Sequence, residues 1–269
     1  MKKQHTLALL LLAGLALGSC SSDDSTEPNK PSNEVKTYHA TTVANMGENG
    51  TRTLSLDGAT LNVGWATYEE VYVFPSGEDN YLGTMKPTVI DGTAATLVGD
   101  ITSSSIEAGD VVILRFPQEE LNYSGQTGTL DDLAKDHDFA ELETTIESVY
   151  GDNVTIKGGT FVSRQAIVKF TFTDGTDPID FRDGTMTISG SAIRGETVDL
   201  SPASQSSDIE HGVIYAALPI VENASATTLT ISGTTNFLRG EKSYTGTKYI
   251  SIPMENGKFY TATVTLTAE

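Results

Sequence analysis

One residue near the N-terminus has the chemistry for covalent lipid attachment. Cys20 is the only cysteine of the 269-residue chain. It follows two lysines, an apolar run over residues 7–17 and a Gly-Ser pair. This order is typical of a secretory signal peptide, and the apolar run is shorter than the roughly 20 residues that span a bilayer. We expect cleavage after residue 19 and acylation of Cys20; the alternative is a plain signal peptide with a chance cysteine.

Other residue types that could do chemistry are dispersed along the chain. His39, His137 and His211 have no spacing that would form a zinc site. The sequence contains no nucleophile elbow and no phosphate-binding loop. Acidic groups at residues 131–132 and 136–138 could hold a cation, but such residues are more often the solvated face of a helix. We therefore expect no enzyme, no catalytic residue, no metal site and no cofactor.

Three aromatic residues could form a sugar-binding platform. Trp65 is the only tryptophan, and Tyr68 and Tyr72 follow it closely. Such rings also pack into a core or along a strand edge. We favour this second interpretation, because Trp65 stands between two expected strands.

The composition limits the partners. The formal net charge is −19, and loss of the signal peptide removes two further lysines. A chain this acidic is not expected to bind nucleic acid, which needs basic patches. Residues 20–33 form a lipidated acidic linker with no large apolar residue after Cys20. Its pair Asp23-Asp24 resembles a surface-export signal of lipoproteins. The alternative is an ordinary acidic tether.

The remaining chain predicts an all-β protein. Residues Thr, Val, Ile and Tyr recur in short runs between Gly, Asp and Asn turn signals, a pattern typical of sandwiches and barrels. One helix is expected over residues 129–142, with Thr129 as its N-cap and acidic residues in its first turn. We place an N-terminal domain at residues 34–159 and a C-terminal domain at residues 160–269. Residues 185–190 and 228–233 are alike, which indicates two similar strands within one sandwich.

Several segments together resemble the fimbrillin family, the subunits of type V pili in gut and oral Gram-negative anaerobes. The likeness covers nearly the whole chain from residue 35 to residue 267. It is carried by residues 51–58 (Thr-Arg-Thr-Leu-Ser-Leu-Asp-Gly), Trp65 with residues 71–74, residues 123–130 (Tyr-Ser-Gly-Gln-Thr-Gly-Thr-Leu), residues 165–170, residues 216–219 and residues 258–260.

The resemblance implies two transthyretin-like β-sandwich domains, with the helix in the N-terminal one. It also implies assembly in which a surface protease removes an N-terminal strand and a strand of the next subunit fills the open groove. Arg52 occupies the family's basic position, so an arginine-specific protease is expected to cut between Arg52 and Thr53. An ordinary strand arginine is the alternative.

The C-terminus supplies the candidate donor strand. Tyr260, Ala262, Val264 and Leu266 share one face of an expected strand, and threonines occupy the other. This alternation suits a donated strand and a strand that stays in its own domain equally well.

These observations predict a structural subunit of a cell-surface fimbria, at the stalk, at the tip or as an accessory. Its expected partners are other fimbrial subunits, the outer membrane through the precursor's lipid, and the processing protease. The alternative is a surface lipoprotein that binds glycan or host protein without polymerising.

Overall fold

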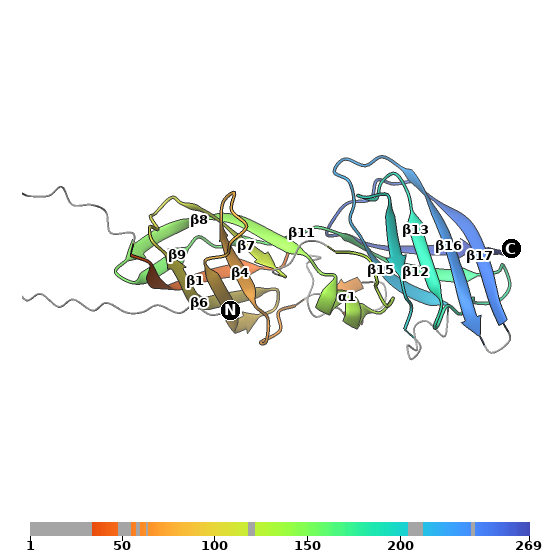
Figure 1. Cartoon of the computed structure of the whole chain (residues 1–269), viewed down its shortest axis with the longest axis horizontal. Helices are drawn as coiled ribbons and strands as arrows, with labels where there is room; N and C mark the ends of the chain where they lie inside the picture. Colours follow the sequence, from red (N-terminus) through yellow and green to blue (C-terminus); the bar gives the residue numbers. More distant parts are fainter. Residues whose placement is uncertain are drawn as a thin grey trace, which may run out of the picture. The chain divides into compact units, whose positions relative to one another are not determined.

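The structure is a computed structural model that describes residues 34–47, 55–57, 60–62, 64–117, 122–203, 212–237 and 240–269. Residues 35–269 form one compact unit. Within the described residues the chain is almost entirely β, with a single short helix (Figure 1). The expectation of an all-β protein with one short helix is therefore confirmed. No described helix is long and apolar enough to cross a bilayer.

The first half of the chain forms a ring of strands. β9 pairs with both β1 and β8, so the path β1-β6-β5-β4-β7-β8-β9 returns to β1. β2 and β3 form a separate hairpin. The strands are β1 (Lys36–Asn45), β2 (Ser55–Asp57), β3 (Thr60–Asn62), β4 (Val71–Pro75), β5 (Gly83–Asp91), β6 (Ala94–Ser103), β7 (Val111–Phe116), β8 (Ala140–Tyr150), β9 (Asn153–Ile156), β10 (Gly159–Thr160) and β11 (Val162–Ser163).

Alternating side chains build the core of this ring. Every second residue of β1 is buried, as are Leu97 and Ile101 on β6. We call this cluster the first core. Trp65 belongs to it: its ring packs edge-on against Phe116 and Phe161, and its indole N–H donates to the Thr93 carbonyl at 3.0 Å. The preference for core packing over a sugar platform is thus supported at this residue.

The second half forms two sheets around a second core. One sheet has the order β15-β12-β18, and the other has the order β14-β13-β16-β17-β19. Phe170 and Ile214 of the first sheet share the core with Ile188 and Ile231 of the other. The strands are β12 (Ala166–Thr173), β13 (Thr185–Ser189), β14 (Thr197–Leu200), β15 (Val213–Leu218), β16 (Thr227–Phe237), β17 (Gly240–Ile250), β18 (Phe259–Thr265) and β19 (Thr267–Ala268).

The internal likeness between residues 185–190 and 228–233 has a structural explanation. β13 and β16 are antiparallel neighbours, and Ile188 stands opposite Ile231 in their register. Both isoleucines are fully buried. The two similar segments are therefore adjacent strands of one sheet, as the sequence indicated.

The helix α1 (Leu130–Asp136) is shorter than expected. Its N-cap is Thr129, whose side chain accepts a hydrogen bond from the Asp132 amide. The prediction that it continues to residue 142 is wrong, because Ala140 and the following residues pair with β7 as strand β8. Leu133 packs into the second core, although the helix was expected to belong to the N-terminal domain.

A segment that we call the strap, residues 122–129, crosses to the second sandwich. The fully buried Gln126 side chain pairs with Ala217 on β15 as a peptide group would: its amide donates to the Ala217 carbonyl at 2.8 Å, and its oxygen accepts from the Ala217 amide at 2.7 Å. The Gln126 carbonyl accepts from the Ser201 amide, beyond β14. The strap thus satisfies backbone groups at the edges of both sheets.

Candidate functional site: the N-terminal and C-terminal strands

Three of the residues singled out from the sequence lie outside the described residues. These are Cys20, Arg52 and Thr53. In the chain, Arg52 follows β1 and precedes β2. A cut after Arg52 would therefore separate Cys20 and the whole of β1 from the rest of the protein. The consequences of such a cut depend on how β1 is held.

β1 presents a regular buried face to the first core. Its inward residues have exposed fractions of 7% or less, while their neighbours along the strand are mostly exposed. The hydroxyl oxygen of Thr42, in the middle of this face, has no hydrogen-bond partner among the described residues. A buried hydroxyl without a partner is destabilising. The inward residues are Tyr38, Ala40, Thr42, Ala44 and, after the strand, Met46.

β1 is held on both sides by backbone pairing. It pairs with β6 in antiparallel register along its whole length, from Lys36 opposite Ser103 to Asn45 opposite Ala94. On its other side it pairs in parallel with β9 and then with β10. Removing β1 would open the ring and expose unpaired edges on β6 and β9. These edges can only be satisfied by another strand or by water.

The candidate donor strand lies in its own core. β18 pairs in parallel with β12 from Phe259 opposite Ile167 to Thr265 opposite Thr173. Ala262, Val264 and Leu266 are buried, and Tyr260 is half-buried, with its pKa raised by burial. After Leu266 the chain joins the other sheet through β19, which pairs with β17. The last strands thus close one side of the second sandwich.

The strands β1 and β18 share a short sequence. Residues 36–41 read Lys-Thr-Tyr-His-Ala-Thr, and residues 258–263 read Lys-Phe-Tyr-Thr-Ala-Thr. When they are aligned, Tyr260 matches Tyr38 and Ala262 matches Ala40 on the buried face. Comparing the two ends of the chain with each other would have found this signal.

The likeness continues along the buried face in size, although not in sequence. Val264 stands in the place of Thr42 and has the same shape without the hydroxyl. Leu266 and Ala268 take the places of Ala44 and Met46, although Ala268 is exposed in its own chain. Each pair combines one large and one minimal side chain, so the two faces contain the same number of side-chain heavy atoms. In the C-terminal segment, residues 258–268, the side chains that align with the buried face of β1 are thus similar to it in total volume.

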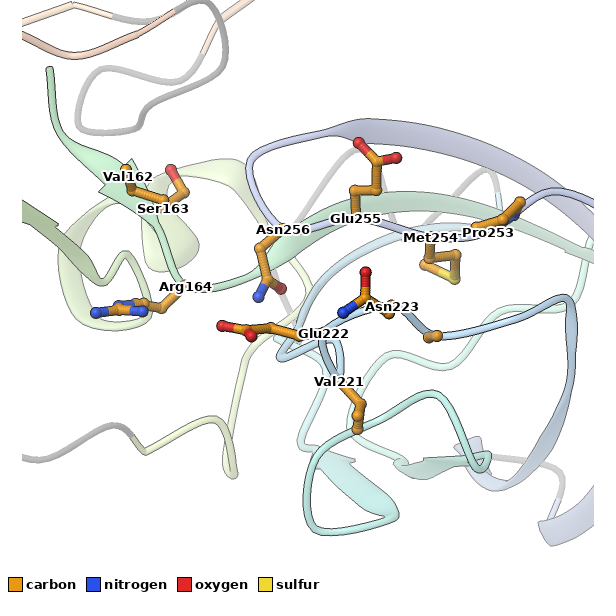
Figure 2. A pocket seen from close by; sticks show the side chains of 11 residues that line it. Val162, Ser163, Arg164, Val221, Glu222, Asn223, Pro253, Met254, Glu255 and Asn256 are labelled. Atoms are coloured by element: carbon orange, nitrogen blue, oxygen red, sulfur yellow. The ribbon is translucent and has the colours of Figure 1, made fainter.

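The residues that lead into β18 border a hollow. A pocket of about 630 Å³ lies between residues 253–256, residues 221–224 and residues 162–164 (Figure 2). Asn256 fixes one wall, because its side chain donates to the Ile220 carbonyl and accepts from the Ile220 amide. Figure 2 shows the Arg164 side chain extending away from Met254 and Pro253. Packing on this side of residues 251–257, which we call the connector, is incomplete.

The other polar groups near this region have structural roles. Gln165 is buried; its amide donates to Asp138 at 2.8 Å, and its oxygen lies 3.1 Å from the Tyr123 hydroxyl. Burial, followed by the nearby charge of Asp138, raises the pKa of Tyr123 far above its usual range. A phenol held neutral in this way links the strap to the start of β12.

The described residues contain no cluster of three or more histidine, cysteine or acidic side chains that could hold a metal ion. His39 contacts Asp100 on the exposed face of β1 at 2.6 Å. Asp132 accepts the Thr127 amide near the helix start, which is a structural role. His211 lies outside the described part of the chain.

No family model matches the sequence, and no curated protein matches it. Among solved structures, the chain is similar to candidate cell adhesion proteins of three Bacteroides species. The protein from Bacteroides fragilis is 11% identical with a TM-score of 0.45, over 86% of this chain and 97% of that one. The corresponding values are 13%, 0.41, 87% and 96% for Bacteroides ovatus, and 12%, 0.38, 85% and 85% for Bacteroides eggerthii.

Proposed function

We propose that this protein is a structural subunit of a cell-surface fimbria, exported as a lipoprotein precursor and assembled by exchange of β1 for the C-terminal segment of another copy. The observation that carries the proposal is the match between the buried faces of β1 and residues 258–268. The resemblance of the sequence to fimbrillins is a second support, because it rests mostly on segments outside residues 258–268.

Proteolysis supplies the trigger in this proposal. While the chain is intact, β1 is tethered to the ring, so its local concentration at the groove is very high. A strand from another molecule has to compete against this tethered strand. Cleavage between Arg52 and Thr53 by an arginine-specific surface protease turns β1 into a separate peptide. It can then leave, and the edges of β6 and β9 become available.

The incoming segment is well suited to the vacated groove. Burial of Tyr260, Val264 and Leu266 in the groove, at roughly 1.5–3 kcal/mol each, is on the order of 5–8 kcal/mol per junction and offsets the burial that these side chains lose in their own core. Main-chain pairing adds to this, as in other strand-addition complexes. Replacing Thr42 by Val264 also removes the buried hydroxyl that lacks a partner. Once β1 is free, the new strand can occupy the groove in its place.

The lipid has a temporary role in this scheme. Acylated Cys20 holds the precursor at the outer membrane, facing outward, until the protease acts. Because Cys20 lies upstream of Arg52, the cut discards the lipid together with β1. The assembled subunit is then held only by its neighbours, and the fimbria supports adhesion. The proposed steps are the same whether the subunit lies in the stalk, at the tip or as an accessory.

The proposal is tested by blocking the cut in producing cells. Arg52→Ala is expected to leave a lipidated monomer at the surface and to abolish detergent-resistant ladders on gels. Arg194→Ala, at an exposed arginine of the second half, is the matched control and should assemble normally. Ladders of normal length from the Arg52→Ala variant contradict the proposed trigger.

A second test removes the donor. Deletion of residues 257–269 is expected to abolish polymers while an exported, processed monomer remains. If this variant fails to fold, the segment is required in its own domain, and a strand that serves only there is the better interpretation. A full-length chain that binds immobilised polysaccharide but forms no ladders would favour a binding module instead.

A further inference from the structure

A group of aromatic side chains lies on the outer face of the ring, away from the first core. Val73 of β4 points into that core, so its neighbours Tyr72 and Phe74 point outward. Phe74 is only 2% exposed, although it belongs to neither core. It packs instead against the ring of Tyr81 and against the Arg115 guanidinium, which lies 4.0 Å from the centre of its ring. We call Tyr72, Phe74 and Tyr81 together the aromatic face.

The rings of the aromatic face are held in place and yet accessible. Tyr81 meets Tyr72 edge-on with 5.2 Å between ring centroids, and its centroid lies 6.1 Å from that of Phe74. Tyr81 nevertheless remains 45% exposed. Tyr68 and Tyr150 are more exposed, but neither packs against another ring in the described part of the chain. A ring that is already fixed loses little freedom when a ligand stacks on it.

Polar groups border these rings, and their charges are paired. The Tyr72 hydroxyl donates to Glu70 at 3.3 Å, and the Glu70 carboxylate lies 2.8 Å from the Lys86 ammonium. On the other side of β4, the Arg115 guanidinium lies 3.9 Å from the Glu141 carboxylate. The charges that border the rings therefore offset each other. The net charge of −19 further disfavours an anionic ligand.

We infer that the aromatic face binds a neutral polysaccharide. A sugar ring has an apolar C–H face that stacks on an aromatic ring, and its hydroxyls form hydrogen bonds with polar side chains. Tyrosine combines an apolar ring with a hydrogen-bonding hydroxyl. Thr84, which is partly exposed and stands opposite Tyr72 on β5, adds a second hydroxyl. A cationic ligand would instead have to compete with Lys86 and Arg115 for their acidic partners.

The aromatic face lies outside the part of the ring that strand exchange would alter. β4, β5 and β7 all follow Arg52 in the sequence, and β6 separates β1 from β5 in the ring. Each subunit of a polymer would therefore present one such face. A polymer that binds through many weak sites gains avidity without any new contact. This repetition rests on the proposed function, and it gives the fimbria a class of ligand for adhesion.

Binding to immobilised neutral mannan, galactan and β-glucan tests the inference, with heparin as the anionic comparison. Two forms of the full chain are measured, the polymers sheared from the cell surface and the monomer of the Arg52→Ala variant. Both are expected to bind at least one neutral polysaccharide and not heparin. The polymers should bind about 100-fold more tightly than the monomer because of their avidity.

Substitutions of Tyr81 in the same monomer assign the binding to the aromatic face. Tyr81→Leu removes the ring but keeps an apolar side chain over Phe74, and it should weaken binding roughly tenfold at an unchanged denaturation midpoint. Tyr81→Phe keeps the ring and should bind like the unmodified face. Tyr150→Leu, at an exposed tyrosine outside the face, is the matched control. Thr84→Val removes only a hydroxyl, should also weaken binding, and decides the matter if Tyr81→Leu does not fold.

The results separate failure of the inference from failure of the proposed function. Binding that is weakened in Tyr81→Leu and kept in Tyr81→Phe and Tyr150→Leu supports the aromatic face. Equal binding by Tyr81→Leu and the unmodified face overturns it, as does binding to heparin alone or to none of the polysaccharides. Normal ladders would then leave the proposed function intact. Neutral polysaccharide bound through Tyr81 by chains that never form ladders supports the face and overturns the proposed function.

Discussion

The two halves of the molecule close their cores in different ways. The ring of the first half is completed by β1, which pairs on both sides and precedes a candidate cleavage position. The second sandwich is completed by the strap on one side and by the C-terminal strands on the other. One core thus depends on the strand that precedes Arg52, and the other on the strands at residues 259–268. In the proposed assembly, the strand at residues 259–265 passes to the first core of another copy.

The largest expected effects come from substitutions next to β18 and β1, which should affect polymers differently. Leu266→Ala should destabilise the monomer by about 2–5 kcal/mol, because Leu266 is buried in the second core. It should also weaken polymers, since the same side chain fills the groove of the neighbour. Chemical denaturation of the monomer and the temperature at which ladders dissociate measure the two effects.

Met46→Ala is the matched comparison. Met46 is fully buried in the first core, so the monomer should lose a similar free energy of unfolding, about 2–5 kcal/mol. Polymers that form should dissociate at the unmodified temperature, because Met46 is discarded with β1. Equal weakening of polymers by both substitutions would show that β1 remains in the assembled subunit.

The strap should have the next largest effect. Gln126→Ala leaves the Ala217 amide and carbonyl without their side-chain partner in a buried site. We expect a loss of about 2–3 kcal/mol from the free energy of unfolding, since each buried unsatisfied group costs about 1–3 kcal/mol. Ser124→Ala, at an exposed position of the strap, should change stability by less than about 0.5 kcal/mol. Denaturation monitored by fluorescence measures both variants. Equal free energies of unfolding would show that the Gln126 side chain does not stabilise the fold.

A smaller effect of opposite sign is expected in the middle of β1. Thr42→Val should stabilise the monomer by about 1 kcal/mol, because it removes a buried hydroxyl that has no hydrogen-bond partner among the described residues. After cleavage β1 should leave more slowly, and polymers should appear later in a time course. Thr41→Val, at an exposed position of the same strand, is the control and should leave the time course unchanged.

The smallest effect concerns an exposed ion pair of the first half. The hydrogen bond from Lys86, at 2.8 Å, lowers the pKa of Glu70. Since the folded state depresses this pKa, the stabilisation is present above pH 4.5 and is lost as the pH falls through the lowered value. Both side chains are largely exposed, so Glu70→Gln should change the free energy of unfolding by less than about 0.5 kcal/mol at pH 7. A larger change in the free energy of unfolding at pH 7 would contradict this small contribution of the ion pair. A change that stays the same at acid pH would also contradict it.

Periodicity was sufficient to predict an all-β protein because most strands have one face in a core. The alternation in β1 and β18 and the adjacent strands β13 and β16 were readable in this way. The helix end could not be predicted in this way, because the apolar residues Phe139, Ala140 and Leu142, with Glu141 between them, suit both a helix and a strand. Pairing with β7 decides between them, and that contact is not local in sequence.

The candidate site was only partly predictable. The donor face at Tyr260, Ala262, Val264 and Leu266 follows from alternation alone, whereas its parallel pairing with β12 depends on the order of strands in the sheet. The role of Gln126 was also hidden, because a glutamine that pairs like a peptide group has no sequence signature. The closure of the ring by β9 depends on distant contacts, and it is this closure that makes β1 a candidate for exchange.

The central claim is that assembled subunits have lost β1 and hold the C-terminal segment of another copy in its place. N-terminal sequencing by mass spectrometry of detergent-resistant polymers sheared from the cell surface tests it most directly. The account predicts chains that begin at Thr53 and polymers that contain no peptide from residues 36–45. Polymers whose chains begin at Cys20 and retain those residues would contradict it.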